Sequence, residues 1–197
     1  MRLIIKKSVY GVFCIAVLPI ALVYLLLGVI LPKDSLVAGY SQLLSLFPGI
    51  TGSYIRKTGL RVALARCHWE CQIGFGVLFS QQDTEIHSGV YIGPQSNIGK
   101  CSIGKNCLIG SGVHIMSGRK QHNFTDTSMP IKDQGGVFEK VTIGENCWVG
   151  NAALIMASIG NNCIVAAGSV VTKPIPDGAI VAGNPAVVVK QRDVPCD

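Results

Sequence analysis

The chain has 197 residues, of which 49% are hydrophobic and 14% charged, and this length accommodates one domain with a core plus a small appendage. Residues 1–66 carry eight basic residues and one acidic residue, a net charge of +7, whereas residues 67–197 carry nine basic and ten acidic residues, a net charge of −1. Because the basic residues flank apolar runs, and no basic stripe interleaved with aromatic residues follows, we expect an anionic membrane surface as a partner and no nucleic acid.

Residues 1–66 are predicted to form an α-helical membrane anchor. Residues 8–32 contain no charged side chain and are rich in Leu, Ile and Val, and crossing a bilayer core takes roughly 20 apolar helical residues. A cleaved signal peptide is disfavoured, because this run exceeds the usual apolar region of about 7–15 residues and no good Ala-x-Ala site follows. A second uncharged run, residues 35–55, is more polar and is a poorer candidate for a span.

A simple span and a re-entrant hairpin both remain open, and the distribution of charge favours the hairpin. Pro19, in the middle of the run, is a possible break at which the helix turns back. Basic residues lie on both flanks, and the positive-inside rule would hold both flanks in the cytoplasm. These flanking residues are Arg2, Lys6, Lys7, Arg56, Lys57 and Arg61. We therefore expect the chain at the inner (cytoplasmic) membrane, with the domain that follows the anchor on the cytoplasmic side.

Residues 67–197 are predicted to form an all-β repeat domain. Apolar, mostly β-branched residues recur six positions apart, with one spacing of five, and most of them are followed by glycine. A period of six fits neither a helix nor a sustained alternation, but it fits a chain that forms a short strand, turns a corner and repeats. Stacked coils of this kind bury one continuous core. The repeating residues are Ile86, Ile92, Ile98, Ile103, Ile109 and Ile115, then Ile143, Val149 and Ile155, then Ile159, Val165 and Val171.

The stretches IGKNCLIGSGVHI, VTIGENCWVGNAALI and AAGSVVTKPIPDGAIVAGNPA resemble the hexapeptide-repeat acyltransferases, closest to the maltose/galactoside and exopolysaccharide O-acetyltransferase branch. The resemblance covers roughly residues 72–190. It implies a left-handed parallel β-helix with three flat sides, acetyl-CoA as co-substrate and a homotrimer with active sites between neighbouring subunits.

The cysteines are predicted to be reduced packing residues. Cys107, Cys147 and Cys163 occupy the small position four residues after a repeating apolar residue, and Cys101 stands one residue before such a position. There is no CxxC pair, and Cys67-x3-Cys71 lacks a second half, so no metal site is expected.

The repeat is interrupted by the insertion 116–142, which concentrates charged residues and is the predicted site of the chemistry. Transfer of an acetyl group to a hydroxyl needs a base near neutrality, a task that suits histidine. The family's catalytic histidine follows a coil of this type by a few residues, and the resemblance assigns that role to His122, although the family spacing is about two residues shorter. Asp126 and Glu139 are alternative partners that would orient the imidazole.

The other histidines are weaker candidates for the catalytic base. His114 lies within a regular coil and is predicted to be a wall residue, with a place in the cleft as the alternative. His87 is expected in a turn, and His68 before the first clear coil. The family also carries an acceptor-binding asparagine one coil before its histidine, near Tyr91-Ile92 here, where no asparagine stands; Asn97 is the nearest, which weakens the case for a simple sugar.

The donor site follows from the resemblance alone. Asn151 would bind the thioester oxygen, where negative charge builds in the transition state. Ala167 would contact the pantetheine arm, and Thr172-Lys173 and Lys190 would lie near the nucleotide end of CoA, with Lys173 pairing with a phosphate. Val187 replaces a family arginine.

The predicted function is therefore acetyl-CoA-dependent O-acetylation of a sugar, polysaccharide precursor or lipid-linked glycan at the membrane. N-acetylation of an amino sugar remains an alternative. A γ-carbonic-anhydrase-like enzyme is disfavoured, because His114 and His122 do not provide the spacing of its zinc ligands. A non-enzymatic β-helix scaffold is disfavoured because a scaffold needs only the repeats.

Overall fold

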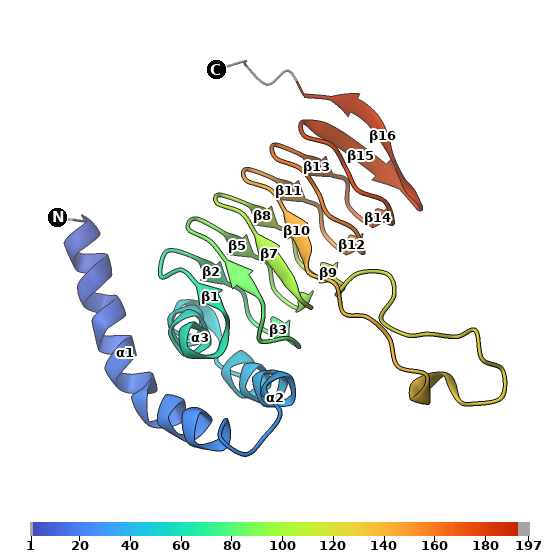
Figure 1. Ribbon diagram of the computed structural model, residues 1–197. Helices are drawn as coiled ribbons and strands as arrows, with labels where there is room; N and C mark the ends of the chain where they lie inside the picture. The colour runs from blue at the N-terminus through green and yellow to red at the C-terminus, as the bar shows by residue number, and fades with distance from the viewer. Residues whose placement is uncertain (1, 193–197) are drawn as a thin grey trace.

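A computed structural model of the chain, which describes residues 2–192, consists of a three-sided solenoid with three helices at its N-terminal end (Figure 1). Side chains are described from Lys6 onward, so the side chain of Arg2 and the end of the predicted domain, residues 193–197, lie outside the described residues. The helices are α1 (Arg2–Leu27), α2 (Lys33–Ser45) and α3 (Gly49–Ala63), with one 3-10 turn, η1 (Ile131–Asp133).

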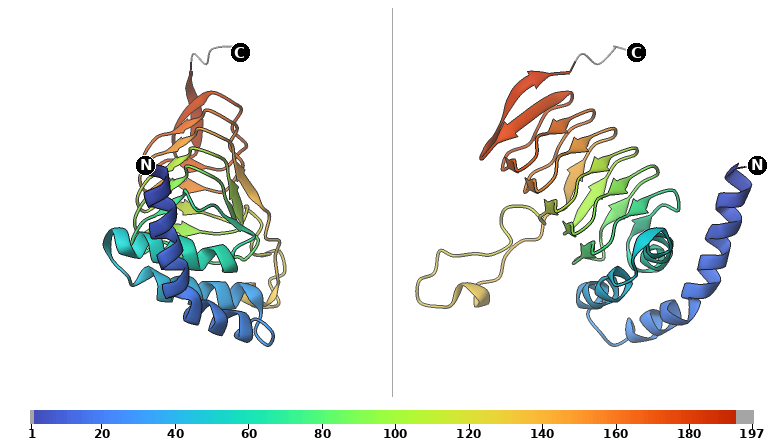
Figure 2. Two further views of the ribbon diagram at one scale, coloured as in Figure 1. Left: turned by 90° about the vertical axis from the view of Figure 1, so that its left-hand side faces the viewer. Right: turned by 180° about the vertical axis from the view of Figure 1, so that it is seen from behind.

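Sixteen short strands come after the helices and stack into three mostly parallel sheets (Figure 2). The first sheet contains β1 (Arg66–Cys67), β4 (Glu85–Ile86), β7 (Cys101–Ile103) and β10 (Val141–Ile143). The second contains β2 (Gln72–Ile73), β5 (Tyr91–Ile92), β8 (Leu108–Ile109), β11 (Trp148–Val149), β13 (Ile164–Val165), β15 (Ala179–Gly183) and β16 (Ala186–Gln191). The third contains β3 (Leu78–Phe79), β6 (Asn97–Ile98), β9 (His114–Ile115), β12 (Leu154–Ile155) and β14 (Val170–Val171).

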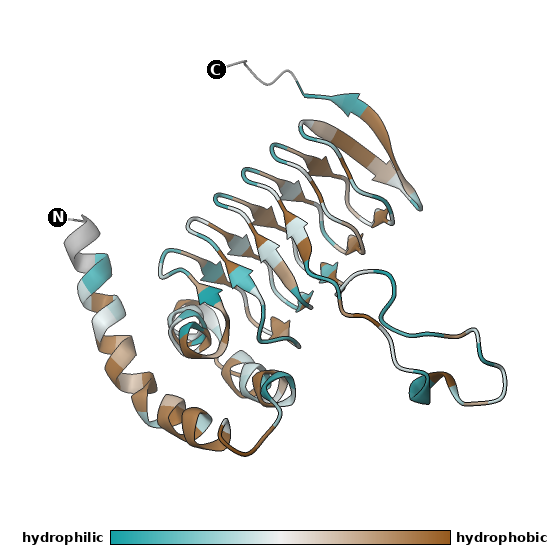
Figure 3. Ribbon diagram, in the orientation of Figure 1, coloured by the Kyte–Doolittle hydropathy of each residue, from teal (hydrophilic) through white to brown (hydrophobic). Residues whose placement is uncertain are grey.

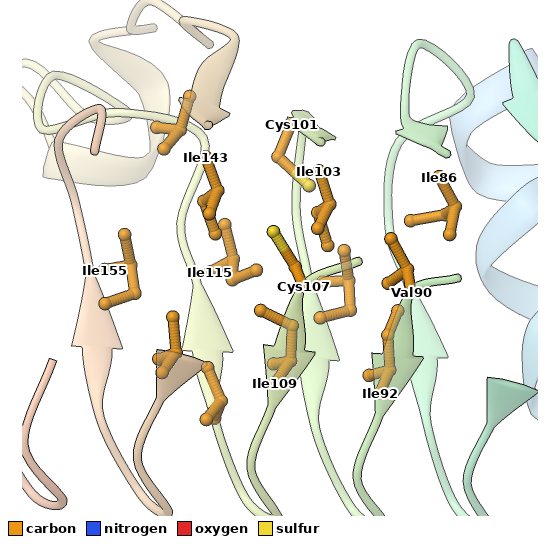
Figure 4. Packing of buried hydrophobic residues seen from close by; sticks show 14 of the residues in the cluster. Ile86, Val90, Ile92, Cys101, Ile103, Cys107, Ile109, Ile115, Ile143 and Ile155 are labelled. Carbon is orange, nitrogen blue, oxygen red and sulfur yellow. The ribbon is translucent and has the colours of Figure 1, made fainter. Parts of the chain in front are cut away.

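The repeating apolar residues form the core, as the sequence predicts. Each of the twelve is at most 2% exposed, and equivalent residues of successive coils pair in register, for example Ile92 with Ile109 and Ile109 with Val149. Figure 4 shows members of this set, among them Ile92, Ile109 and Ile155, directed into the space between the sheets. The parallel β-solenoid is therefore confirmed; its left-handed sense stays a prediction from the resemblance.

The inward cysteines pack and also form hydrogen bonds. The Cys107 thiol donates to the Gly144 carbonyl oxygen at 2.9 Å, and those of Cys147 and Cys163 donate to the carbonyls of Gly160 and Pro176, each at 3.0 Å. These thiols therefore satisfy carbonyl groups at one corner of the next coil. The described cysteines are all free, and the Sγ atoms of Cys67 and Cys71 lie 3.6 Å apart.

The helices α2 and α3 cover the open end of the solenoid. Leu44 and Leu60 belong to the same buried cluster as the isoleucines of the coils, and the Ser41 hydroxyl bonds the backbone of Phe79 in β3. The solenoid also begins earlier than the sequence suggests, because β1 and β2 place His68 inside the first coil rather than before it. The helices α2 and α3 therefore form a cap on the first coil of the solenoid.

The expectation that Arg56 joins a basic membrane flank is wrong. Its side chain is 1% exposed; Nε donates to the Ile73 carbonyl at 3.0 Å, and Nη1 donates to the Phe47 carbonyl. Burial lowers the pKa of this guanidinium. Its hydrogen bonds satisfy the two backbone carbonyl groups, which belong to neighbouring segments. Arg56 is thus a structural residue of the cap.

Helix α1 lies against the cap with one face and exposes the other. Val17, Ala21 and Tyr24 are buried, whereas residues such as Ile15 and Leu26 are more than two thirds exposed. Residues 6–27 are long and apolar enough to cross a membrane, and Figure 3 shows the hydrophobic colour along most of this helix. The helix continues through Pro19, so the chain does not turn back at that residue.

Candidate active site

The insertion leaves the solenoid after β9 and returns at β10 as a long excursion away from the sheets (Figure 1). Its two arms are joined by backbone hydrogen bonds from Glu139 to Ser117, Val137 to Lys120 and Asn123 to Gly135, each between 2.7 and 2.9 Å. His122 lies on the outgoing arm, between the second and third of these bonds. The arms are therefore paired at the base, and this pairing fixes the backbone around the histidine.

The returning arm is held to the first sheet by an ion cluster. The Lys140 Nζ lies 2.7 Å from Asp83 Oδ1 and 2.6 Å from Glu85 Oε1, and the Lys100 Nζ lies 3.3 Å from Asp83 Oδ2. The hydrogen bond from Lys140 lowers the pKa of both carboxyls. Burial alone would lower the pKa of Lys140, but its bonds to Asp83 and Glu85 outweigh that effect and raise it. His87 joins the cluster, 3.5 Å from Glu85.

A pocket of about 250 Å³ opens where the outgoing arm leaves the third sheet. Its polar side chains include Asn97 of β6, His114 of β9, Gln121 of the arm and Gln42 of α2. Asn97 and His114 are stacked in register on neighbouring coils, and the Asn97 Nδ2 lies 3.5 Å from His114 Nδ1. An imidazole beside amide groups, in a pocket bounded by a strand, a helix and a loop, can hold a hydroxyl through hydrogen bonds.

His114 is thus a residue of the solenoid wall that also lines this pocket. His122 is exposed on the same arm, directly after Gln121 of the pocket lining. Asp126 Oδ1 accepts bonds from the Ser128 N–H at 2.8 Å and hydroxyl at 2.6 Å, and these bonds lower the pKa of that carboxyl. Neither Asp126 nor Glu139 bonds His122 within residues 2–192.

The position of Asn97 relative to the two histidines could not be read from the sequence. A coil here takes 17 residues rather than 18, because the spacing between Ile98 and Ile103 is one short, and this brings Asn97 directly beneath His114. The asparagine therefore lies one coil before His114, the histidine of the solenoid wall.

Asn151 and Ala167 stack at the corner between the second and third sheets. The Gly168 N–H donates to the Asn151 carbonyl at 2.8 Å, and the Asn151 Oδ1 accepts the Ser111 N–H at 2.9 Å. Asn161 Oδ1 and Asp177 Oδ1 accept backbone N–H groups in the same way elsewhere in the solenoid. The oxygen atoms of Asn151 thus form hydrogen bonds between coils. The residue is exposed, and its Nδ2 group takes no part in these bonds.

The other residues predicted to bind the acetyl donor, Thr172, Lys173 and Lys190, lie in two separate places in the solenoid. Thr172 and Lys173 follow β14 at the opposite edge of the third sheet from Asn151, and Thr172 lines a pocket of about 230 Å³ with Arg119 and Glu139 at the base of the insertion. Lys190 lies on β16, which pairs antiparallel with β15 after a turn at 183–186. Lys190 therefore belongs to the second sheet, whereas Thr172 and Lys173 follow a strand of the third.

No group of three or more His, Cys, Asp or Glu side chains that could hold a metal ion occurs in the described part of the chain. His68 pairs instead with Glu70, at 3.7 Å.

Two family models match the solenoid. The model described as bacterial transferase hexapeptide (six repeats) matches residues 83–117, and the hexapeptide repeat of succinyl-transferase matches residues 140–173. The two segments lie on either side of the insertion. Comparison with curated protein sequences finds no match.

Solved structures share the fold at low identity. A maltose O-acetyltransferase from Clostridium difficile 630 is 21% identical, with a TM-score of 0.73 over 82% of this chain and 87% of that one. A hexapeptide-repeat-containing acetyltransferase from Vibrio cholerae is 17% identical, with a TM-score of 0.68 over 82% and 94%. A galactoside acetyltransferase in complex with coenzyme A is 21% identical, with a TM-score of 0.63 over 82% and 84%. Hexapeptide-repeat models thus match on both sides of the insertion, and the chain shares the solenoid fold of these acetyltransferases.

Proposed function

We propose that the chain transfers an acetyl group from acetyl-CoA to a hydroxyl of a sugar, polysaccharide precursor or lipid-linked glycan at the membrane, with His122 as general base. The observation that carries the proposal is the position of the outgoing arm. Gln121 of this arm lines the pocket, and His122 is the next residue along the chain. The polar lining of the pocket, Asn97, His114 and Gln121, suits a hydroxylated acceptor.

The donor side of the proposal follows the corner where Asn151 and Ala167 stack. CoA would lie along the third sheet, from this corner toward Thr172 and Lys173, so that the Asn151 Nδ2 donates to the thioester oxygen and Lys173 pairs with a phosphate. Lys190, on the second sheet, would reach the nucleotide from a neighbouring subunit of a homotrimer. Binding of coenzyme A by the galactoside acetyltransferase of the same fold supports this donor.

Membrane attachment is proposed to occur through the exposed apolar face of α1. The Lys57 Nζ of α3 lies 5.9 Å from the Tyr10 ring centroid of α1, so basic residues from both sides of the apolar run share one end of the anchor. Under the positive-inside rule, that shared end and the catalytic domain belong in the cytoplasm, at the inner membrane, where acetyl-CoA is available. The anchor would then hold the active site beside lipid-linked acceptors.

The test is the release of free thiol from acetyl-CoA in the presence of lipid-linked and free sugar acceptors, with the wild type and His122→Ala compared. Loss of a general base predicts a reduction in kcat of at least about a hundredfold. His114→Ala serves as the comparison and is expected to raise KM more than it lowers kcat. Unchanged turnover of His122→Ala contradicts the assignment, and acetylation of an amino group instead of a hydroxyl would establish the N-acetyltransferase alternative.

A further inference from the structure

A groove of about 440 Å³ lies between α1 and α3, on the side of the cap away from the candidate active site. Its lining combines apolar side chains with a small polar end. The apolar part includes Val17, Leu18, Ala21 and Val62, and the polar part includes Tyr10, Thr58 and Arg61. None of these residues lines the pocket that contains His114.

Two hydroxyls at the polar end are buried without a hydrogen-bond partner. They are the Tyr10 hydroxyl and the Thr58 Oγ1, and the Thr58 residue is only 7% exposed. A buried hydroxyl without a partner destabilises the folded state, so such groups in proteins are normally satisfied by other protein groups, water or a ligand. Both hydroxyls line one groove, which indicates a polar ligand there.

The charge at this end of the groove is positive. Arg61 is exposed and forms no ion pair within the described residues, and its guanidinium suits bidentate binding of a phosphate. Lys57 precedes Arg61 by four residues on the same helix and lies 4.0 Å from the Tyr54 ring centroid. The Trp69 ring centroid lies 6.2 Å from that of Tyr10. A cationic end flanked by tyrosine and tryptophan is typical of the membrane–water interface.

We propose that this groove binds one anionic phospholipid, with its phosphate held by Arg61 and the Tyr10 and Thr58 hydroxyls and an acyl chain along Val17, Ala21 and Val62. The site rests on the proposed attachment of α1 to the membrane. The lipid would also bridge α1 to α3, which fixes the anchor to the catalytic domain.

The test measures thermal unfolding of the full chain in a neutral detergent, with and without a short-chain phosphatidylglycerol. Phosphatidylcholine with the same chains and glycerol 3-phosphate are the comparison ligands. The midpoint should rise with phosphatidylglycerol, less with phosphatidylcholine and not at all with glycerol 3-phosphate. Arg61→Gln should abolish the rise, whereas Arg66→Gln, the loss of another exposed arginine, on β1, should retain it. Equal losses in the two variants, or an equal response to glycerol 3-phosphate, would overturn the site.

Thr58→Val should have opposite effects on the unfolding midpoint without lipid and on the shift that lipid causes. Removal of an unpartnered hydroxyl at nearly constant volume should raise the midpoint in the absence of lipid and reduce the shift that phosphatidylglycerol causes. A lower midpoint without lipid together with a full lipid shift would count against the site. Because these measurements need no bilayer, they are independent of membrane attachment, which is tested by carbonate extraction of membranes that contain the chain with and without residues 1–27.

Discussion

At the scale of residues, the candidate site depends on which side chains the coils bring into register. His114 and Asn97 meet because equivalent positions of successive coils stack, so their contact at 3.5 Å follows from the coil length. The sequence identified both histidines and noted Asn97 as the nearest asparagine, but it did not show that Asn97 lies beside His114. It also counted Arg56 as a membrane-facing charge, since the composition of a segment does not show which of its cations the fold buries.

Asn97→Ala should raise KM for the acceptor about tenfold, the effect of losing roughly one hydrogen bond of about 1.4 kcal/mol, and should change kcat little. The reason is that the amide contributes to binding beside His114, whereas proton removal is assigned to His122. Steady-state kinetics with acceptor varied at saturating acetyl-CoA measure this. Glu145→Ala, which removes an exposed side chain outside the pocket, is the control. An equal loss of kcat and of kcat/KM would instead place Asn97 in the chemical step.

At the scale of elements, the solenoid was predictable and the cap was not. The six-residue repeat is a local pattern, so the position of each isoleucine within a coil can be predicted from the few residues around it. The helices α2 and α3 contain glycine, serine and threonine and carry no apolar repeat of the coil type, and only their packing of Leu44 and Leu60 on the first coil shows them to be part of the core. The path of the insertion could not be predicted either, because its paired arms and the ion cluster involve residues far apart in sequence.

Asp83→Asn should loosen the returning arm of the insertion and destabilise the fold slightly at pH 7, by about 0.2–1 kcal/mol in low salt, since Asp83 is largely exposed. The folded-state pKa values of Asp83 and Glu85 are lowered, so the stabilisation is complete above their ordinary values of 3.8 and 4.5 and is lost as the pH falls through the lowered values. Urea unfolding of wild type and variant from pH 3 to pH 7 should therefore show a difference that shrinks below about pH 4. A difference that grows toward acid pH would contradict the cluster's role.

At the scale of the whole molecule, the three sides of the solenoid differ in character. The outer face of the second sheet carries Tyr91, Leu108, Trp148 and Ile164 on neighbouring strands, and Leu108 and Trp148 are 46% and 51% exposed. The first sheet instead carries the ion cluster. We therefore expect the second sheet to contact neighbouring subunits in the proposed trimer.

Trp148→Glu should dissociate the trimer, because it places a charge within the apolar part of that interface. Thr142→Glu, on the outer face of the first sheet, is the matched control and should leave the assembly intact. Light scattering after size-exclusion chromatography measures the mass of both variants in detergent, with the detergent contribution subtracted. If Trp148→Glu remains trimeric, the interface lies on another side of the solenoid.

The most direct test of the proposed function is acetyl transfer itself, by the purified full chain in lipid nanodiscs with acetyl-CoA and a lipid-linked glycan. We predict thiol release that depends on the acceptor, together with an acetyl ester on the glycan detected by mass spectrometry. Thiol release that is absent with every hydroxyl and amine acceptor, from a chain that binds CoA and retains its fold, would contradict the proposed function.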